Sequence, residues 1–352
     1  MATLSSTTVL VTGGSGFIGN YVILALLSAG YTVKATIRKL SRDAEVRSYL
    51  TNGGATTSDL SRLTFIAASL DSDDGWAEAV KGCTFVHHIA SPFPAELPKH
   101  EDDMIIPARE GTLRVLKAAS AAGVKRTILT SSFGAVAYGK PWTEKPFTEE
   151  DWTVLDDPKH PTTSYMKSKT IAEKAAWEFI NSEENASKME LVVILPLMVF
   201  GPVLGKDTST SLEVARKLMD GSMPGCPRLS FIFVDVRDIA SINMLAMTTP
   251  AAAGQRYIAG NDDAAFSMLD VANVIREKRP GVGKKPPSFE VPNFVVHLLA
   301  VFDKVVRQVL PDLGKVPKAS NAKAKEELGW KARGTEESIV DTVDSMVKYG
   351  VV

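Results

Sequence analysis

Short apolar segments alternate with amphipathic segments along the first two hundred residues. The apolar segments are rich in β-branched residues and are strand-like, and they cover residues 7–12, 31–37, 63–68, 84–90, 126–131 and 190–196. Helical patterns lie between them, at residues 18–30, 44–50, 74–81, 101–122 and 164–181. Strands separated by helices are joined by crossover connections and form a parallel sheet, and their nearly continuous apolar character indicates burial on both faces. The pattern predicts an α/β fold with a Rossmann-type, doubly wound parallel sheet.

The pattern changes after Pro196. The stretch that follows is rich in Gly, Pro and Ser, which is typical of a connection. Residues 229–247 return to a strand followed by a helix, and the remainder is more helical and richer in proline. We therefore expect a nucleotide-binding domain in residues 1–200, to which 229–247 return, and a smaller substrate-binding portion in residues 201–228 and 248–352.

The charge balance and the cysteine content limit the classes of partner. The chain of 352 residues has a net charge of -1, so nothing favours nucleic acid or an anionic membrane surface. No basic segment precedes the short apolar run at the N-terminus, and no apolar run reaches the ~18 residues of a membrane span, so we expect neither a signal peptide nor a transmembrane helix. Cys83 and Cys226 offer no metal-binding spacing and fit a reduced, cytoplasmic compartment.

A glycine-rich turn follows the first strand. Gly13, Gly16 and Gly19 stand three residues apart in TGGSGFIG, where the strand pattern gives way to a helix. Such glycines allow a tight turn, a close approach of the backbone to a pyrophosphate, and close packing of the helix on the sheet. The free N–H groups and the dipole of the helix N-terminus attract the phosphates. This context predicts a dinucleotide site, and a plain tight turn is the alternative.

The end of the second strand indicates which dinucleotide binds. An acidic residue at this place holds the adenosine ribose hydroxyls of NAD. Here the strand ends at Arg38, Lys39 and Arg42 follow, and no acid occurs before Asp43. A guanidinium can grip a 2′-phosphate with two hydrogen bonds. We therefore predict NADP(H) as the cofactor, and the alternative is a solvated basic turn.

Tyr165 and Lys169 lie one helical turn apart and share a helix face. A carbonyl group that accepts a hydride needs a proton on its oxygen, and a tyrosine hydroxyl can donate it, provided that a nearby ammonium favours the phenolate. Lys169 can also bind the nicotinamide ribose. The fifth strand ends in a serine pair, at the sheet edge where ligands bind in such folds. We expect Ser132 to hold the substrate oxygen, with Ser131 as the alternative.

Together these features resemble the extended short-chain dehydrogenase/reductase superfamily, in particular its group of dihydroflavonol 4-reductases, cinnamoyl-CoA reductases and fungal methylglyoxal reductases. The resemblance covers nearly the whole chain and is carried by TGGSGFIG, VKATIRK, HHIASPF, PAREGTLRVLKAA, LTSSFGAV, FTEEDW, SYMKSKTIAEKAAWEF, LPLMVFGP, FVDVRDIA and LGWKARGTEESI. It implies that Ser132, Tyr165 and Lys169 are catalytic. The cofactor contacts that it implies, besides Tyr165 and Lys169, are Gly13, Gly14, Ser15, Gly16, Phe17, Ile18, Arg38, Arg42, Ala90, Ser91, Pro196, Leu197 and Val199.

One position departs from that group. Its members commonly have an aspartate followed by an apolar residue after the third strand, where the acid faces the adenine. This chain has Ser69 and Leu70 there. A serine can still form a hydrogen bond, so we expect both residues at the cofactor, without the acidic contact.

Three functions are compatible with these residues. The first is NADPH-dependent reduction of a ketone or aldehyde to an alcohol by a monomer or homodimer. The second is a nucleotide-sugar epimerase or dehydratase with bound NAD, against which Arg38 argues. The third is a non-enzymatic NADP(H)-sensing regulator, a class that tends to lose the tyrosine and lysine kept here. The small-molecule carbonyl substrate would be selected by the C-terminal portion and by loops at 92–104, 133–163 and 200–228.

Overall fold

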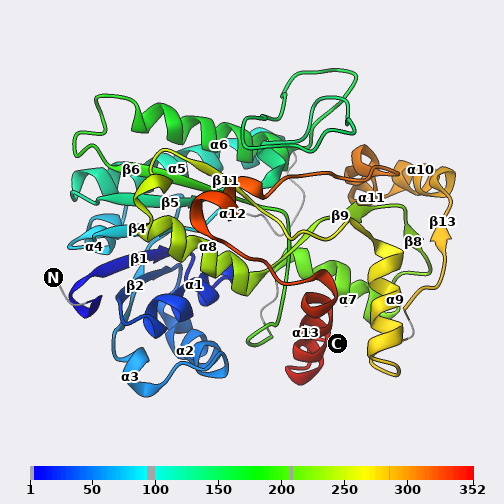
Figure 1. Ribbon diagram of the computed structural model, residues 1–352, viewed down its shortest axis with the longest axis horizontal. Coiled ribbons are helices and arrows are strands. Elements are labelled where there is room, and N and C mark those ends of the chain that lie inside the picture. The colour runs from blue at the N-terminus through cyan, green and yellow to red at the C-terminus, as the bar shows by residue number, and fades with distance from the viewer. Residues whose placement is uncertain (1–3, 93–99, 207–208, 285) are drawn as a thin grey trace.

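The computed structural model describes residues 4–92, 100–206, 209–284 and 286–352 (Figure 1). Its centre is a seven-stranded sheet in which every neighbouring pair is parallel, in the order β11-β6-β5-β4-β1-β2-β3. The chain winds outward from β1 in both directions, so the predicted doubly wound fold is confirmed. The strands are β1 (Thr8–Thr12), β2 (Thr32–Ile37), β3 (Leu63–Ala67), β4 (Phe85–His88), β5 (Arg126–Thr130), β6 (Glu190–Pro196) and β11 (Arg256–Ala259).

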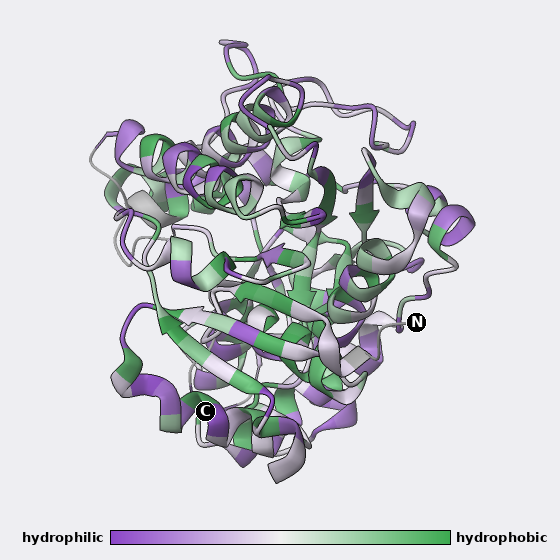
Figure 2. Cartoon of the chain, turned by 90° about the vertical axis from the view of Figure 1, so that its left-hand side faces the viewer, coloured by the Kyte–Doolittle hydropathy of each residue, from purple (hydrophilic) through white to green (hydrophobic). Residues whose placement is uncertain are grey.

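Helices cover both faces of this sheet. One face packs against α1 (Phe17–Ser28), α2 (Asp43–Asn52), α8 (Val236–Thr248) and α12 (Ala322–Leu328), and the short α3 (Thr57–Leu60) follows α2. The other face packs against α4 (Trp76–Val80), α5 (Asp102–Ala121) and α6 (Ser164–Ile180). Figure 2 shows hydrophobic residues concentrated along the central strands. Burial on both faces explains the nearly continuous apolar runs of β1 and β6, whereas the edge strand β3 alternates between buried and exposed residues.

A third hydrophobic cluster forms a smaller lobe beside the sheet, built from α7 (Glu213–Asp220), α9 (Met268–Lys278) and α13 (Thr335–Lys348). Short strand pairs join its loops: β7 (Met198–Phe200) with β10 (Phe233–Asp235), β8 (Cys226–Pro227) with β13 (Glu290–Val291), and β9 (Ser230–Phe231) with β12 (Phe266–Ser267). Helices α10 (Asn293–Phe302) and α11 (Lys304–Gln308) lie at its edge (Figure 1). Single 3-10 turns are η1 (Leu4–Ser6), η2 (Leu40–Arg42), η3 (Phe133–Ala135), η4 (Thr210–Leu212), η5 (Pro250–Ala252) and η6 (Leu310–Asp312).

The division of the chain differs from the expected one at β11 and α12. Both were expected in the substrate-binding portion, yet β11 pairs with β6 in the central sheet and α12 packs on its face. The four-residue strand RYIA stands between Gly254 and Gly260 and is too short to show a clear period. Of residues 229–247, helix α8 packs along α1 and contacts β5 and β6, whereas β9 and β10 pair with β12 and β7 outside the central sheet. Within the described residues, no helix is long and apolar enough to cross a membrane.

Candidate active site

The turn from β1 into α1 has the geometry that its glycines require. Gly13 has a φ of 70°, and a Cβ there would lie 3.1 Å from the backbone of Ala90. A Cβ at Gly19 would lie 2.2 Å from the carbonyl oxygen of Gly13, so only glycine lets α1 approach the turn. Helix α1 begins after Gly16 without a side-chain cap, which leaves its first N–H groups for an anion. This cradle fits the pyrophosphate of a dinucleotide. Ser15 belongs to the turn and Phe17 and Ile18 begin α1, and their contact with the cofactor stays a prediction.

Thr12 connects this turn to the neighbouring strand β4. Its Oγ1 accepts hydrogen bonds from the N–H groups of Ile89 and Ala90, both at 3.0 Å, and lies 2.9 Å from Nδ1 of His88. With both lone pairs used, the Thr12 hydroxyl donates to Nδ1, so the proton of a neutral His88 sits on Nε2. The network fixes the backbone of Ala90 beside Gly13. The glycine pattern gave no sign of this role for Thr12.

The two histidines of β4 are buried and are not placed to act as bases at neutral pH. Burial lowers the pKa of His87 to about 4, although a hydrogen bond with Asn243 opposes the shift. Burial, followed by the positive charge of Lys169, lowers the pKa of His88 to about 3. Ala90, Ser91 and Lys169 also line one small cavity together.

Ser132 and Tyr165 face each other across the carboxyl edge of the sheet. Ser132 follows β5 and caps η3 by accepting a hydrogen bond from the N–H of Gly134 at 3.0 Å. Helix α6 is capped by the Thr163 side chain, and its first turn presents Tyr165 with Oη 3.3 Å from Oγ of Ser132. Nζ of Lys169 lies 5.9 Å from the Tyr165 ring centroid. The structure therefore brings the three predicted catalytic side chains within reach of one small ligand.

The neighbouring Ser131 points into the core instead. Its Oγ donates to the carboxylate of Glu173 at 2.6 Å, and Arg256 of β11 donates to the same carboxylate at 2.6 Å. Glu173 is fully buried on α6, one turn beyond Lys169. Successive residues at a strand end point in opposite directions, so the geometry favours Ser132 over Ser131. Neither Glu173 nor Arg256 was expected, since nothing in the spacing links α6 with β11.

The ends of β2 and β3 gather the residues expected at the adenosine half. Arg38 is exposed, whereas Arg42 forms a 2.6 Å ion pair with Glu45. The Ser69 hydroxyl, followed by the charges of Arg114 and Arg38, holds the pKa of Asp71 below its ordinary value. Arg38 and Ser69 therefore act on the same carboxylate and lie at one edge.

Four further residues expected at the cofactor lie in two places. Leu70 packs on α5, where a Cβ at Gly111 would lie 2.8 Å from the Cβ of Leu70. Pro196 ends β6, Leu197 donates its N–H to Ala259 at 3.1 Å, and Val199 is buried in β7. Because β6 neighbours β5, these three stand at the same edge of the sheet as Ser132.

Thiol and metal chemistry have no evident site in the described residues. Burial raises the pKa of Cys83 and of Cys226 to about 11 each. A thiol with so high a pKa is a poor nucleophile. The described ranges contain no group of three or more His, Cys, Asp or Glu side chains that could hold a metal ion.

Comparison with known proteins identifies the family. Residues 9–260 match the NAD dependent epimerase/dehydratase family. A cinnamoyl-CoA reductase of Medicago truncatula is 36% identical over 78% of this chain and 81% of its own length. The NADPH-dependent methylglyoxal reductase of Saccharomyces cerevisiae is 30% identical over 97% of this chain and 98% of its own. The crystal structure of yeast methylglyoxal/isovaleraldehyde reductase complexed with NADPH has a TM-score of 0.78 and 28% identity, covering 98% of this chain and 100% of that one. The chain therefore belongs to the NAD dependent epimerase/dehydratase family and, within it, to the extended short-chain dehydrogenases/reductases.

Proposed function

We propose that this protein catalyses the NADPH-dependent reduction of a ketone or aldehyde to an alcohol. The observation that carries the proposal is the approach of Tyr165 Oη to Ser132 Oγ, 3.3 Å, at the sheet edge that also holds the glycine turn. Two hydroxyls so placed can hold one carbonyl oxygen between them. The reductases among the relatives, one of them crystallised with NADPH, support the same class of reaction.

The residues present fit the cofactor. The uncapped N–H groups at the start of α1 would hold the pyrophosphate, and Gly13, Gly14 and Gly16 leave room for its close approach. Arg38 would bind the 2′-phosphate, while Arg42 shares its guanidinium with Glu45. NADPH bound in this way supplies the hydride for a carbonyl carbon placed beside Tyr165.

The side chains of the chain itself handle the proton. Ser132 donates a hydrogen bond that orients the carbonyl oxygen. Tyr165 gives its phenolic proton to that oxygen as the carbon–oxygen double bond becomes a single bond. The ammonium of Lys169 stabilises the phenolate that remains, and solvent returns the proton.

The direct test mixes purified protein with NADPH or NADH and a panel of ketones and aldehydes, and follows absorbance of the reduced nicotinamide. We expect oxidation of NADPH, with much slower oxidation of NADH, by at least one carbonyl compound. The opposite result, no oxidation with any carbonyl and NAD retained by the purified protein, would instead support a nucleotide-sugar epimerase or dehydratase.

A further inference from the structure

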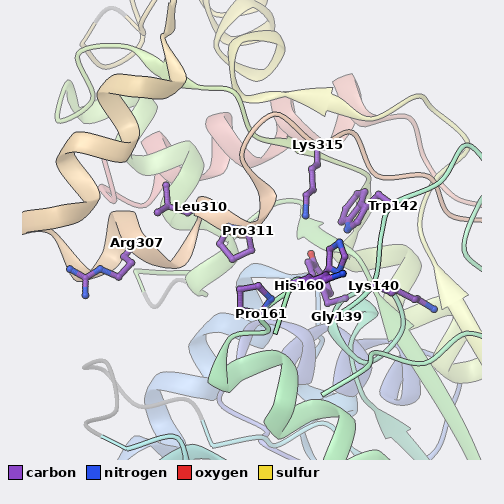
Figure 3. A pocket seen from close by; sticks show the side chains of 11 residues that line it. Gly139, Lys140, Trp142, His160, Pro161, Arg307, Leu310, Pro311 and Lys315 are labelled. Carbon is purple, nitrogen blue, oxygen red and sulfur yellow. The ribbon is translucent and has the colours of Figure 1, made fainter. Parts of the chain in front are cut away.

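A cavity of about 430 Å³, open on one side, is lined by three segments of the chain (Figure 3). Residues 138–142 form one wall, and they follow Ser132 through η3. Residues 159–161 form a second wall and lead directly into α6, which carries Tyr165. Residues 307–315 of α11 and η6 form the third. Both segments that bear candidate catalytic side chains therefore continue into this cavity.

Tyr138 places the cavity next to the candidate active site. Thr153 joins its backbone to the segment next to Ser132, because the Thr153 hydroxyl accepts the N–H of Tyr138 at 3.0 Å and donates to the carbonyl oxygen of Gly134 at 2.8 Å. Burial raises the pKa of Tyr138, and the negative charges of Asp312 and Tyr165 add to the shift. Tyr138 also stacks edge-on with Trp142, their ring centroids 5.9 Å apart. The two rings form an apolar wall of the cavity. A substrate with its carbonyl at Tyr165 can extend along this wall.

Every charged side chain that lines the cavity is basic. Lys140, Lys159, Arg307 and Lys315 contribute cationic groups, and His160 adds an imidazole. Lys315 and His160 lie against Trp142 in Figure 3, with Nζ of Lys315 5.7 Å from the Trp142 ring centroid. The whole chain has a net charge of -1, so this concentration of positive charge is local.

Some of this charge is already neutralised by neighbouring carboxylates. Lys140 pairs with Asp151 at 2.8 Å, and Nδ1 of His160 lies 3.0 Å from Asp157. The Arg307 guanidinium donates to the carbonyl oxygens of Ala300 and Val301, both at 3.0 Å. Within the described ranges, Lys159 and Lys315 form no side-chain ion pair with a protein carboxylate.

Two carboxylates lie beside these lysines: Asp157 accepts the backbone N–H of Lys159 at 2.8 Å, and Asp312 feels the charge of Lys315. Asp312 is the less usual of the two. Its Oδ1 is buried without a hydrogen-bond partner among the described residues. Burial raises the pKa of Asp312 to about 6, although the charge of Lys315 opposes the shift. These carboxylates offset only part of the positive charge of the side chains that line the cavity.

We propose that this cavity selects carbonyl substrates that carry an anionic group, a carboxylate or a phosphate, at the end remote from the carbonyl. The inference rests on the proposed reductase function of the same site. Lys159 and Lys315 supply the charge, and the low polarity of the adjacent aromatic wall strengthens the interaction. Trp142 and Tyr138 suit a flat or apolar body between the two ends of the substrate.

The test compares substrates that differ only in charge. We would measure kcat/KM with NADPH for para-formylbenzoate, for its neutral methyl ester and for para-formylphenyl phosphate, and binding of each by calorimetry. We expect the better of the two anions to exceed the ester by about tenfold at low salt, and the advantage to shrink at high salt. Carboxylate and phosphate are distinguished by which of the two shows the larger advantage.

Two variants locate the effect. Lys315→Met should remove most of the advantage of the anion over the ester, while Lys331→Met, at an exposed lysine outside the cavity, should leave it intact. Equal kcat/KM for acid and ester, unaffected by salt and by Lys315→Met, would overturn the inference and leave the reductase function standing. Preferential binding of the anions without turnover of any carbonyl would instead contradict the reductase function and keep the anion site.

Discussion

The two ends of the proposed substrate site are built in different ways. The cofactor end rests on backbone geometry: the left-handed Gly13, the close contact at Gly19, and the Thr12 hydroxyl that ties β1 to β4. The cationic cavity rests on side chains from loops, with Lys159 and Lys315 more than a hundred residues apart in sequence. Backbone geometry tolerates few substitutions, whereas loop side chains exchange freely. The comparison suggests one fixed reaction and an adjustable choice of substrate.

Removal of the proposed proton donor at the cofactor end should have the largest effect on turnover. Tyr165→Phe deletes one hydroxyl and should lower turnover by ~10²–10⁴-fold, because it removes the phenolic proton that would pass to the carbonyl oxygen. Steady-state oxidation of NADPH measures turnover, and a fluorescence titration should show unchanged NADPH affinity. Tyr257→Phe is the matched control, since it removes a buried hydroxyl that donates to Glu327 at 2.7 Å, away from the site. Similar turnover in the two variants would argue against the mechanism.

The next largest effect should be on the preference of the protein for NADPH over NADH. Arg38→Asp should weaken NADPH binding by ~10–100-fold, because a charge-assisted hydrogen bond to the 2′-phosphate is replaced by repulsion. NADH, which lacks that phosphate, should lose little affinity. Lys39→Asp makes the same change of charge one residue away and should have a smaller effect. Equal losses for NADPH and NADH in Arg38→Asp would refute the assignment of the phosphate contact.

The hydrogen bonds of Thr12 at the cofactor end should also contribute to the stability of the fold. Thr12→Val removes the acceptor for two buried N–H groups and the donor to His88, so the free energy of unfolding should fall by ~1–3 kcal/mol. Urea denaturation measures the change. Thr8→Val, on the same strand, makes the same substitution without a side-chain hydrogen bond among the described residues. A loss no larger than that of Thr8→Val would show that the network is dispensable.

A smaller effect on stability is expected from the protonation of Asp312 beside the cavity. Folding raises the pKa of Asp312 from 3.8 to about 6, so the folded state binds this proton more tightly than the unfolded chain. Stability from this group is therefore present below pH 3.8 and is lost as the pH rises through 6. Asp312→Asn should raise the free energy of unfolding by ~1 kcal/mol at pH 8 and give no gain at pH 4.

The same variant should increase the preference for anionic substrates, since it removes a negative charge behind the cavity. Thermal unfolding at the two pH values measures stability, and the acid-to-ester ratio of kcat/KM measures preference. A gain that is identical at both pH values would mean that the Asp312 carboxylate is not the cause.

The sequence predicted the parts of the molecule that depend on local spacing. The alternation of strands and helices predicts the sheet, and the glycine spacing predicts the turn at Gly13, because both arise from contacts within a few residues. The spacing of Tyr165 and Lys169 likewise places them on one helix face. The catalytic and cofactor roles of these residues stay predictions, although the structure brings their side chains to one edge.

What the sequence could not provide depends on contacts between distant segments. The choice between Ser131 and Ser132 required the position of Glu173, and β11 was too short to stand out from its surroundings. The cavity joins three segments, and its positive charge disappears in a net charge of -1 for the whole chain. A local sequence pattern cannot indicate that three distant segments meet at one cavity.

The buried carboxylate of Glu173 has a consequence for the direction of Tyr165. A helix held at one place along its length can rotate about its axis. Ser131 of the β5 end and Arg256 of β11 hold Glu173 from two strands, two turns of α6 beyond Tyr165. Rotation of α6 would break both bonds and leave a charge uncompensated in the interior. The angle at which the phenol meets a ligand is therefore set inside the protein, before any ligand arrives.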